Sequence, residues 1–360
     1  MKRTDRIGIL QKELATHGLS AALIVGEVNR RYLTYAGIGE GALLITGDDA
    51  VFFTDARFID HAREKVWGCE IRCAQQPLKE AAGLLLSTGL KSCGLEYERV
   101  SAACYLELKE MLPGIRLCPS EGVDGILADM RRIKDDYEIS CLKKAQEIGD
   151  EAYLHMLEFI RAGMKESEVK MELGTYMVKL GSENYGMNFI VSSGKKTAYP
   201  HGGSGDGEIT NGSFVMMDFG GMIEGYSADM TRTVAVGYAD EEMRNVYDTV
   251  KEAKALGLSL LKPGVTGRSV HMAVSDYIAG RGYPGRFTHG LGHSLGLEVH
   301  ENPRCNAWDT SVLKAGEMMT VEPGVYLEGK YGVRIEDMGI LTGDGFENFT
   351  KSANELMILK

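Results

Sequence analysis

Residues 151–181 and 252–282 repeat one sequence pattern: the first segment is EAYLHMLEFIRAGMKESEVKMELGTYMVKLG and the second is EAKALGLSLLKPGVTGRSVHMAVSDYIAGRG. Aligned without gaps, eight of the 31 positions are identical. In both segments apolar residues recur at helical spacing on each side of a glycine-containing turn, which predicts two consecutive helices. We interpret the segments as copies of one structural unit, with convergence of two helix pairs on similar patterning as the alternative.

Strand-like sequence follows each copy. VMMDFGGMIEGYSADMTRTVAV occupies residues 215–236, and MMTVEPGVYLEGKYGVRIEDMGIL occupies residues 318–341. Apolar runs closed by glycine-containing turns predict hairpins. The expected architecture is an internally duplicated ααββ unit around one curved antiparallel sheet, with the helices on its outer face. We assign this α+β domain to residues 125–360 and expect the functional site between its two halves.

A different pattern precedes the duplication. Short apolar runs such as SAALIV, ALLIT and AVFFT alternate with helical patterns such as RFIDHAREK over roughly the first 120 residues. This alternation predicts an α/β domain of five or six strands. The pattern breaks around Pro119 to Asp124, and a long charged helix follows from about Leu127. We therefore place an N-terminal α/β domain at residues 1–124.

Composition limits the class of partner. The 360 residues carry a formal net charge of −11, which argues against nucleic acid and anionic membranes, because both attract basic surfaces. No uncharged apolar stretch is long enough to span a bilayer, and the N-terminal segment has the spacing of a surface helix. The seven cysteines are scattered and never occur in C-x-x-C spacing, so we expect reduced thiols. These features favour a cytoplasmic protein acting on a small soluble substrate.

Four carboxylates occupy matching places in the two predicted hairpins. Asp218 and Asp229 lie eleven residues apart in the first hairpin, and Glu322 and Glu336 take the corresponding places in the second. Burying an ionised carboxylate in an apolar strand is costly unless a positive charge compensates it. A cation explains all four acids together, and their charge balances two divalent ions better than one.

Histidines are concentrated in one segment. THGLGHSLGLEVHENP, residues 288–303, contains His289, His293 and His300, which are three of the eight histidines in the chain. His293 and His300 can face one cavity if the segment is extended between them. His201, in YPHGGSGDG, is a weaker candidate on the sequence alone. Carboxylates combined with imidazoles suit Mn²⁺, Co²⁺, Fe²⁺ or Zn²⁺.

These motifs resemble those of the pita-bread metallopeptidases, a family that includes methionine aminopeptidase, Xaa-Pro aminopeptidase and Xaa-Pro dipeptidase (prolidase). The resemblance covers nearly the whole chain and rests on DFGG…YSADMTRT, HGLGHSLGLEVHE, TVEPGVY and VRIEDM. It implies a pita-bread fold for the second domain. It also implies that Asp218 binds one metal, that His293 and Glu322 bind the other, and that Asp229 and Glu336 bridge the two.

The resemblance implies roles for further residues. His201 and His300 match two active-site histidines of the family that are not ligands, and we expect them to assist catalysis with Glu322 as the proton carrier. His289 and Arg334 match site positions of the proline-specific members. Arg334 lies two residues before Glu336 and would project to the same face of a strand. Tyr226 and Tyr326 are candidate walls of a substrate pocket, or else core residues.

An N-terminal domain of this kind is usual in the proline-specific members of the family. The resemblance therefore implies dinuclear metal-dependent hydrolysis of the peptide bond between an N-terminal residue and proline, by an Xaa-Pro aminopeptidase or dipeptidase. We expect short proline-containing peptides as substrates and two divalent ions, manganese first and cobalt or zinc as alternatives. A homodimer is a further expectation from the family.

Three other functions compete with this hypothesis. They are an aminopeptidase without proline specificity, a metal-free hydrolase resembling creatinase, and a non-enzymatic binding protein of the same fold. The five intact ligand positions argue against the last two. The sequence leaves open the choice between dipeptidase and aminopeptidase, the native metal, and the division of roles between His201 and His300.

Overall fold

The computed structural model describes residues 3–118, 122–184 and 189–360. The chain divides into two compact units, Met1–Arg131 and Arg132–Lys360. The boundary that we predict after residue 124 falls inside helix α6 (Val123–Arg132), and the units divide near the end of that helix. None of the described helices is both long enough and apolar enough to cross a membrane.

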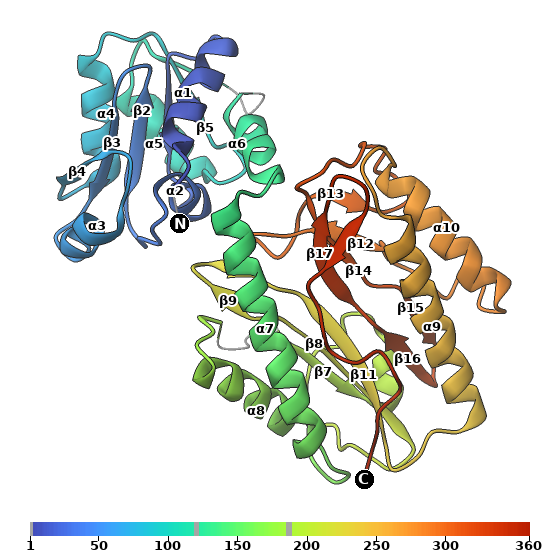
Figure 1. The fold of residues 1–360 in the computed structure, drawn as a ribbon. Helices are drawn as coiled ribbons and strands as arrows, with labels where there is room; N and C mark the ends of the chain where they lie inside the picture. The colour runs from blue at the N-terminus through green and yellow to red at the C-terminus, as the bar shows by residue number, and fades with distance from the viewer. Residues whose placement is uncertain (1–2, 119–121, 185–188) are drawn as a thin grey trace. The chain divides into compact units, whose positions relative to one another are not determined.

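The first unit is an α/β domain built on a six-stranded sheet (Figure 1). The strand order is β4-β3-β2-β1-β5-β6, in which β1 pairs in parallel with β5 and antiparallel with β2. The prediction of an α/β domain with five or six strands is confirmed. Its elements are α1 (Arg6–Thr16), β1 (Ala21–Ile24), α2 (Glu27–Thr34), β2 (Ala42–Thr46), β3 (Ala50–Thr54), α3 (Ile59–Lys65), β4 (Glu70–Cys73), α4 (Pro77–Ser87), β5 (Ser92–Leu95), α5 (Ala102–Met111) and β6 (Arg116–Cys118).

The second unit contains the predicted duplication of two helices followed by strands. Its first half consists of α7 (Asp136–Phe159), α8 (Glu166–Lys179), β7 (Ile190–Ser193), the 3-10 helix η1 (Gly194–Ala198), β8 (Ser213–Phe219), β9 (Met222–Ile223), β10 (Tyr226–Ser227) and β11 (Met230–Val236). Its second half consists of α9 (Glu241–Leu260), α10 (Gly267–Gly280), β12 (Gly292–Ser294), β13 (Glu301–Cys305), β14 (Met318–Val321), β15 (Gly324–Leu327), β16 (Tyr331–Arg334) and β17 (Asp337–Leu341). Two short strands, β18 (Phe346–Asn348) and β19 (Ile358–Leu359), complete the chain.

Backbone pairing also repeats between the halves. Lys165, just before α8, forms an isolated antiparallel bridge with Glu208, and Thr266, just before α10, forms one with Val312. Lys165 and Thr266 are aligned in the sequence repeat. The second helix of each half therefore begins against a later loop of the same half, which lies just before β8 in the first half and just before β14 in the second.

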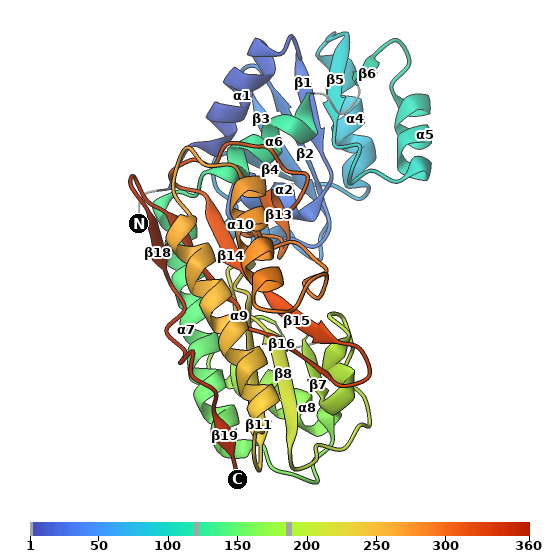
Figure 2. The ribbon, with the colours of Figure 1, turned by 90° about the vertical axis from the view of Figure 1, so that its right-hand side faces the viewer.

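The halves join along β11. Glu336 donates its backbone N–H to the carbonyl of Thr231 over 3.0 Å, and the Thr233 hydroxyl donates to the carbonyl of Arg334 over 2.9 Å. In Figure 1, α7 and α8 lie along one side of the strands and α9 and α10 along the other. In the view turned by 90°, Figure 2 shows that α7 and α9 nevertheless cover the same face of the strands.

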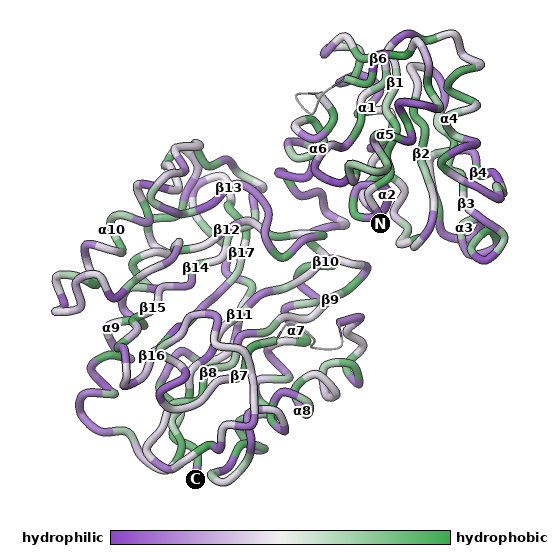
Figure 3. Tube along the Cα trace, turned by 180° about the vertical axis from the view of Figure 1, so that it is seen from behind, coloured by the Kyte–Doolittle hydropathy of each residue, from purple (hydrophilic) through white to green (hydrophobic). Residues whose placement is uncertain are grey.

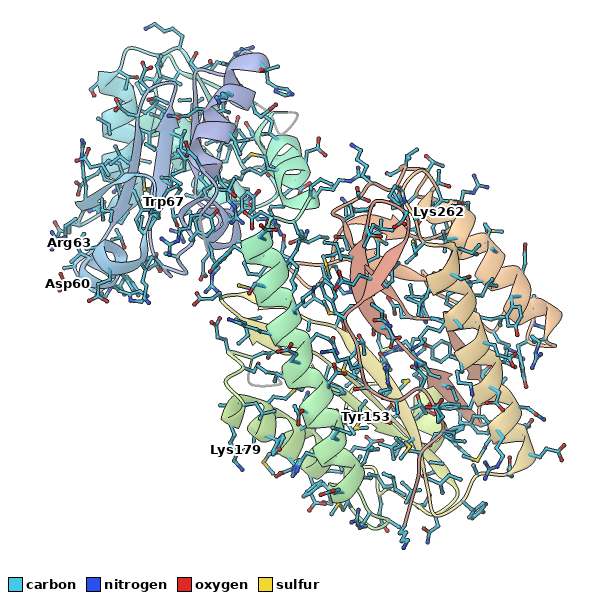
Figure 4. The ribbon with its side chains drawn as sticks, viewed as in Figure 1. Asp60, Arg63, Trp67, Tyr153, Lys179 and Lys262 are labelled. Carbon is cyan, nitrogen blue, oxygen red and sulfur yellow. The ribbon has the colours of Figure 1, made fainter. Side chains whose placement is uncertain are left out.

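Each half buries its own hydrophobic cluster. Met156, Val169 and Met217 belong to the cluster of the first half, and Val250 and Val321 belong to that of the second. Figure 3 shows hydrophobic residues along the central strands and along one side of the helices. Tyr153 of α7 is fully buried, whereas Lys179 of α8 and Lys262, after α9, are exposed (Figure 4). The strands thus pack against the apolar faces of the amphipathic helices.

The turn after Asp218 depends on a glycine, and this generates a test of the hairpin. A Cβ atom at Gly220 would lie 1.7 Å from the carbonyl oxygen of Ala228. We expect Gly220→Ala to reduce the free energy of unfolding by about 1–3 kcal/mol or more, because such overpacking forces the backbone to shift. A clear drop in Tm by differential scanning calorimetry is the expected result.

Gly280→Ala is the matched control in the same unit. Gly280 ends α10, and nothing lies within 4 Å of an added Cβ. Its Tm should stay level or rise, because alanine favours a helix over glycine by about 1 kcal/mol. Equal Tm values for the two variants would contradict the close approach of the two hairpin strands.

Candidate metal centre

A cavity of about 630 Å³ lies in the second unit, and residues of both halves line it. Phe189 and Ile190 form part of its wall from the first half, and Val299 contributes from the second. All the predicted metal ligands and most of the other predicted site residues line this cavity: Asp218, Asp229, His293, Glu322 and Glu336, with His201, His289, His300 and Arg334.

Three of these side chains offer ligand atoms that converge on one point. Oxygen or nitrogen atoms of Asp229, His293 and Glu336 all lie within 4.8 Å of one another. The Nε2 atom of His293 lies 3.7 Å from Oδ2 of Asp229 and 3.4 Å from Oε1 of Glu322. Carboxylates and an imidazole at such separations can share a divalent ion after small side-chain movements.

The tautomer of His293 follows from its hydrogen bond. Its Nδ1 atom lies 3.0 Å from the carbonyl oxygen of Ser294, which can only accept, so Nδ1 carries the proton. The lone pair of Nε2 therefore points at the carboxylates. Burial, followed by the nearby His300, lowers the pKa of His293 to about 3, so the ring is neutral at pH 7. A lone pair that faces two carboxylate oxygens is unfavourable unless a cation lies between them.

The carboxylates show the same unmet need for a cation. Burial first, and then repulsion between the acids, raises the pKa of Asp229 and of Glu336 well above ordinary values. Burial also raises the pKa of Glu322 to about 8, against the opposing effect of Arg334. Glu336 accepts a hydrogen bond from the Thr231 hydroxyl on Oε2 at 2.8 Å, but its buried Oε1 has no hydrogen-bond partner among the described residues. These side chains therefore fit a divalent metal site.

Asp218 lies at the edge of this group. Its Oδ2 atom accepts a hydrogen bond from Nη2 of Arg334 over 2.5 Å. Burial alone would lower the pKa of Arg334, but Tyr326, Asp218 and Glu322 together raise it above its ordinary value. Arg334 also donates from Nη1 to the Tyr326 hydroxyl and to the carbonyl of Pro200. The guanidinium thus connects Asp218 to the segment that carries His201.

Thr231 is a central residue of the site that the sequence analysis missed. It pairs with Asp218 across β8 and β11, and its hydroxyl contacts both Glu336 and the Nε atom of Arg334. Asp229 lies two residues before Thr231, so strand alternation was the available signal.

The prediction that Arg334 and Glu336 share one strand is wrong. Arg334 ends β16 and Asp337 begins β17, so Glu336 lies in the break between two strands. Both side chains nevertheless meet at Thr231.

The histidines surround the carboxylates. His289 lies with Nε2 2.8 Å from the Tyr326 hydroxyl and Nδ1 3.8 Å from Oε2 of Glu322. Burial, followed by Arg334, lowers the pKa of His289 to about 4. The ring centroids of His293 and His300 are 4.4 Å apart. His201 and His300 are exposed side chains at the cavity, one from each half of the unit.

The two predicted tyrosines do not line the cavity in the described part of the chain. Tyr226 is buried in a hydrophobic cluster, with its ring centroid 6.2 Å from that of Tyr137. Tyr326 is buried behind the wall, where it bonds to His289 and Arg334, and burial raises its pKa to about 12. The cavity is instead lined by apolar and polar residues that the sequence analysis did not select: Asn184, Phe189, Ile190, Met222, Val299, Arg304, Asn306 and Trp308.

Comparisons with known proteins agree with this geometry. The model for the Creatinase/Prolidase N-terminal domain matches residues 6–133. An Xaa-Pro dipeptidase of Pyrococcus horikoshii is 34% identical over 343 residues, which cover 95% of each chain. The solved structure of an Xaa-Pro dipeptidase from Bacillus anthracis is 37% identical with a TM-score of 0.94, covering 98% of this chain and 99% of that one. An X-Pro aminopeptidase structure from Thermotoga maritima is 32% identical with a TM-score of 0.92, covering 99% and 100%.

The expected architecture is confirmed by these matches: an N-terminal α/β domain precedes a pita-bread domain with duplicated ααββ units. The resemblance identified from the sequence motifs is confirmed as well. A second family model, described as metallopeptidase family M24, matches residues 140–343, which include every predicted ligand. This match spans more than half of the chain, which therefore belongs to metallopeptidase family M24, whose members are metal-dependent hydrolases.

Proposed function

We propose that this hydrolase cleaves the peptide bond between an N-terminal residue and a following proline in short peptides. The observation that carries the proposal is the cluster of buried and partly buried carboxylates around the neutral His293, in the wall of a cavity large enough for a dipeptide. Similarity over nearly the full length to proteins named Xaa-Pro dipeptidase and X-Pro aminopeptidase supports the choice of substrate.

We assign two divalent ions to the cluster. Asp229 and Glu336 would be shared between them, as the family resemblance implies, and the two carboxylates are close enough for Asp229 to raise the pKa of Glu336. His293 and Glu322 would hold one ion, in keeping with the 3.4 Å between them, and Asp218 the other. When bound, the ions supply polarisation of the substrate carbonyl and a lowered pKa for water. Manganese is our first choice, with cobalt or zinc as alternatives, and a homodimer is the proposed assembly.

Glu322 is the proposed proton carrier. Its carboxylate lies at the cavity beside both His289 and His293. A carboxylate in this position can take a proton from water and deliver it to the leaving nitrogen. That delivery is needed because the nitrogen of a cleaved peptide bond leaves as an amine only when it gains a proton.

His201 and His300 are the proposed hydrogen-bond donors to the substrate. Both are exposed at the cavity, and they come from opposite halves of the unit. Donors that reach the carbonyl oxygen gain strength as negative charge develops on it. His289 is held by Tyr326 and packs edge-on against Phe287 at a centroid distance of 5.1 Å. A fixed ring of this kind suits a wall for the proline ring.

Peptide hydrolysis with controlled metal content tests the proposal. Protein stripped by chelator should be inactive, and Mn²⁺, Co²⁺ or Zn²⁺ should restore release of the first residue from Ala-Pro or Ala-Pro-Ala. Ala-Ala-Ala and Met-Ala-Ala should remain uncleaved. The ratio of Ala-Pro to Ala-Pro-Ala turnover distinguishes a dipeptidase from an aminopeptidase. Cleavage that survives stripping, or equal cleavage of the peptides without proline, would refute the assignment.

The two exposed histidines should affect turnover without affecting metal binding. We expect His300→Ala to lower kcat by about 100-fold, the typical loss for one transition-state donor. The affinity for Mn²⁺ by titration calorimetry should change much less than kcat, because all five proposed ligands remain. A large loss of Mn²⁺ affinity would instead make His300 a ligand.

The raised pKa values predict how the stability of the metal-free protein depends on pH. An acid whose pKa is higher in the folded state stabilises the fold at low pH, and this contribution is lost as pH rises through the folded pKa. Between about pH 6.5, where unfolded histidines become neutral, and pH 8, near the pKa of Glu322, Tm measured in chelator should therefore fall.

Glu322→Gln provides the control for this pH dependence, because it removes one of the acids concerned. Its Tm should fall less steeply over the same pH range than that of the unsubstituted protein. Added Mn²⁺ should abolish the fall in the unsubstituted protein, because the ions favour the ionised carboxylates. An identical slope in both proteins would show that Glu322 does not titrate in this range.

A further inference from the structure

The segment that carries His201 is held by one carboxylate outside the cavity. We call residues 194–207 the His201 loop; it runs between β7 and the residues that precede β8. Glu166, the first residue of α8, is 1% exposed. Its Oε1 atom accepts hydrogen bonds from the backbone N–H and the hydroxyl of Ser193, at 2.7 and 3.1 Å. Its Oε2 atom accepts from Nζ of Lys196 at 2.7 Å and from the backbone N–H of Gly205 at 3.0 Å.

These donors come from both ends of the His201 loop. Ser193 lies just before the loop, Lys196 lies at its start, and Gly205 lies near its end. The backbone of α8 adds two bonds to the same end, from the Glu166 N–H to Gly207 and from the Ser167 N–H to Gly205. A single buried carboxylate with four donors thus closes the base of the loop, and charge-assisted bonds of this type are among the stronger ones in proteins.

The opposite side of the loop is attached to the candidate metal centre. Gly332 donates its N–H to the hydroxyl of Thr197 over 2.8 Å, and Arg334 donates from Nη1 to the carbonyl of Pro200 over 3.1 Å. His201 directly follows Pro200. The position of His201 is therefore defined between Glu166 on one side and Arg334 on the other.

The internal repeat shows that the start of the helix does not require Glu166. Gly267 is aligned with Glu166 in the second half, and α10 begins there without any carboxylate. The start of α8 is capped separately by Glu168, whose side chain accepts from the N–H of Lys165 over 2.8 Å. All four side-chain bonds of Glu166 go to the His201 loop or to Ser193 beside it. The Glu166 carboxylate thus occurs in the first half, which carries His201, and has no counterpart at the aligned Gly267 of the second half.

We propose that Glu166 is a positioning residue that holds the His201 loop in the conformation in which His201 faces the cavity. The role in catalysis rests on the proposed function, in which His201 donates a hydrogen bond to the substrate. A displacement of about 1 Å in such a donor is enough to lower turnover by up to about 100-fold. Glu166 touches neither the cavity nor the proposed ligands, so its effect must pass through the loop.

Glu166→Gln is the informative variant because it preserves shape and removes acceptors. The amide nitrogen of glutamine only donates, so either the Ser193 pair or the Lys196 and Gly205 pair loses its acceptor. Glu168→Gln is the matched control. It removes the same charge two residues further along α8 and affects only the bond to the N–H of Lys165. Glu166→Gln should lower kcat about tenfold with a small change in KM, and Glu168→Gln should leave kcat unchanged.

A double-mutant cycle separates positioning from general destabilisation. When combined with His201→Ala, Glu166→Gln should lower kcat by less than about twofold, because the side chain being positioned is already absent. Mn²⁺ affinity should be equal in all four proteins. A tenfold loss that persists in the His201→Ala background, or no loss in either background, would overturn the proposal.

Hydrogen–deuterium exchange tests the loop without relying on catalysis. Amides of residues 193–205 should exchange faster in Glu166→Gln, while those of the remaining described strands keep their protection. Failure of the unsubstituted protein to cleave Xaa-Pro peptides would refute the proposed function alone, and the exchange result would still decide whether Glu166 holds the loop. Unchanged exchange across the His201 loop would refute the positioning role even in an active enzyme.

Discussion

The structure depends on placing three acidic side chains next to a neutral imidazole in a largely buried site, where Glu336 is buried and the side chains of Asp229 and Glu322 are 13% and 18% exposed. Asp229, Glu322 and Glu336 repel one another, and the lone pair of His293 adds to the negative potential. Burial first, and then repulsion between neighbouring acids, raises the pKa values of these side chains, so the metal-free fold favours their protonated forms. Metal binding removes both the protons and the repulsion, so the energy of the site is coupled to the stability of the fold. The surrounding strands must be stable enough to tolerate the metal-free state.

Glu336 and Asp337 show how the fold tolerates the free-energy cost of burying acidic side chains. Glu336 and Asp337 are neighbours, yet the pKa of Glu336 is raised and that of Asp337 is lowered. Burial would raise both, but Asp337 is paired with Arg232 at 2.8 Å and with Lys254 at 2.5 Å. Arg232 also donates to the backbone carbonyl of Glu336 over 2.6 Å. The buried ion pairs of Asp337 with Arg232 and Lys254 thus fix the backbone next to Glu336, whose own carboxylate is incompletely paired within the described residues.

The sequence predicted the parts of the site that arise from strand periodicity and from the repeat. Asp218 and Asp229 came from one predicted hairpin, Glu322 and Glu336 from the other, and all four line one cavity. Strand alternation from Asp229 places Thr231 on the same face, but its contacts were missed because a threonine as such does not indicate metal or acid chemistry. Trp308 and Arg304 were missed for another reason. Trp308 lies beyond the end of β13 and Arg304 is the penultimate residue of that strand, and tertiary packing instead of local pattern brings both to the cavity.

The duplication also explains why the two halves cannot be interchangeable. Equivalent hairpins supply the carboxylates as symmetric pairs. Among the described residues, however, the histidine of the cluster comes from the second half alone, and each half offers a different exposed histidine. Binding an ion requires only convergent ligands, whereas acting on a peptide with a direction requires different groups at its two ends. Symmetry therefore accounts for the proposed metal-binding acids, and the departures from it, at His293, at the His201 loop and at Glu166 opposite Gly267, account for the proposed orientation of a substrate.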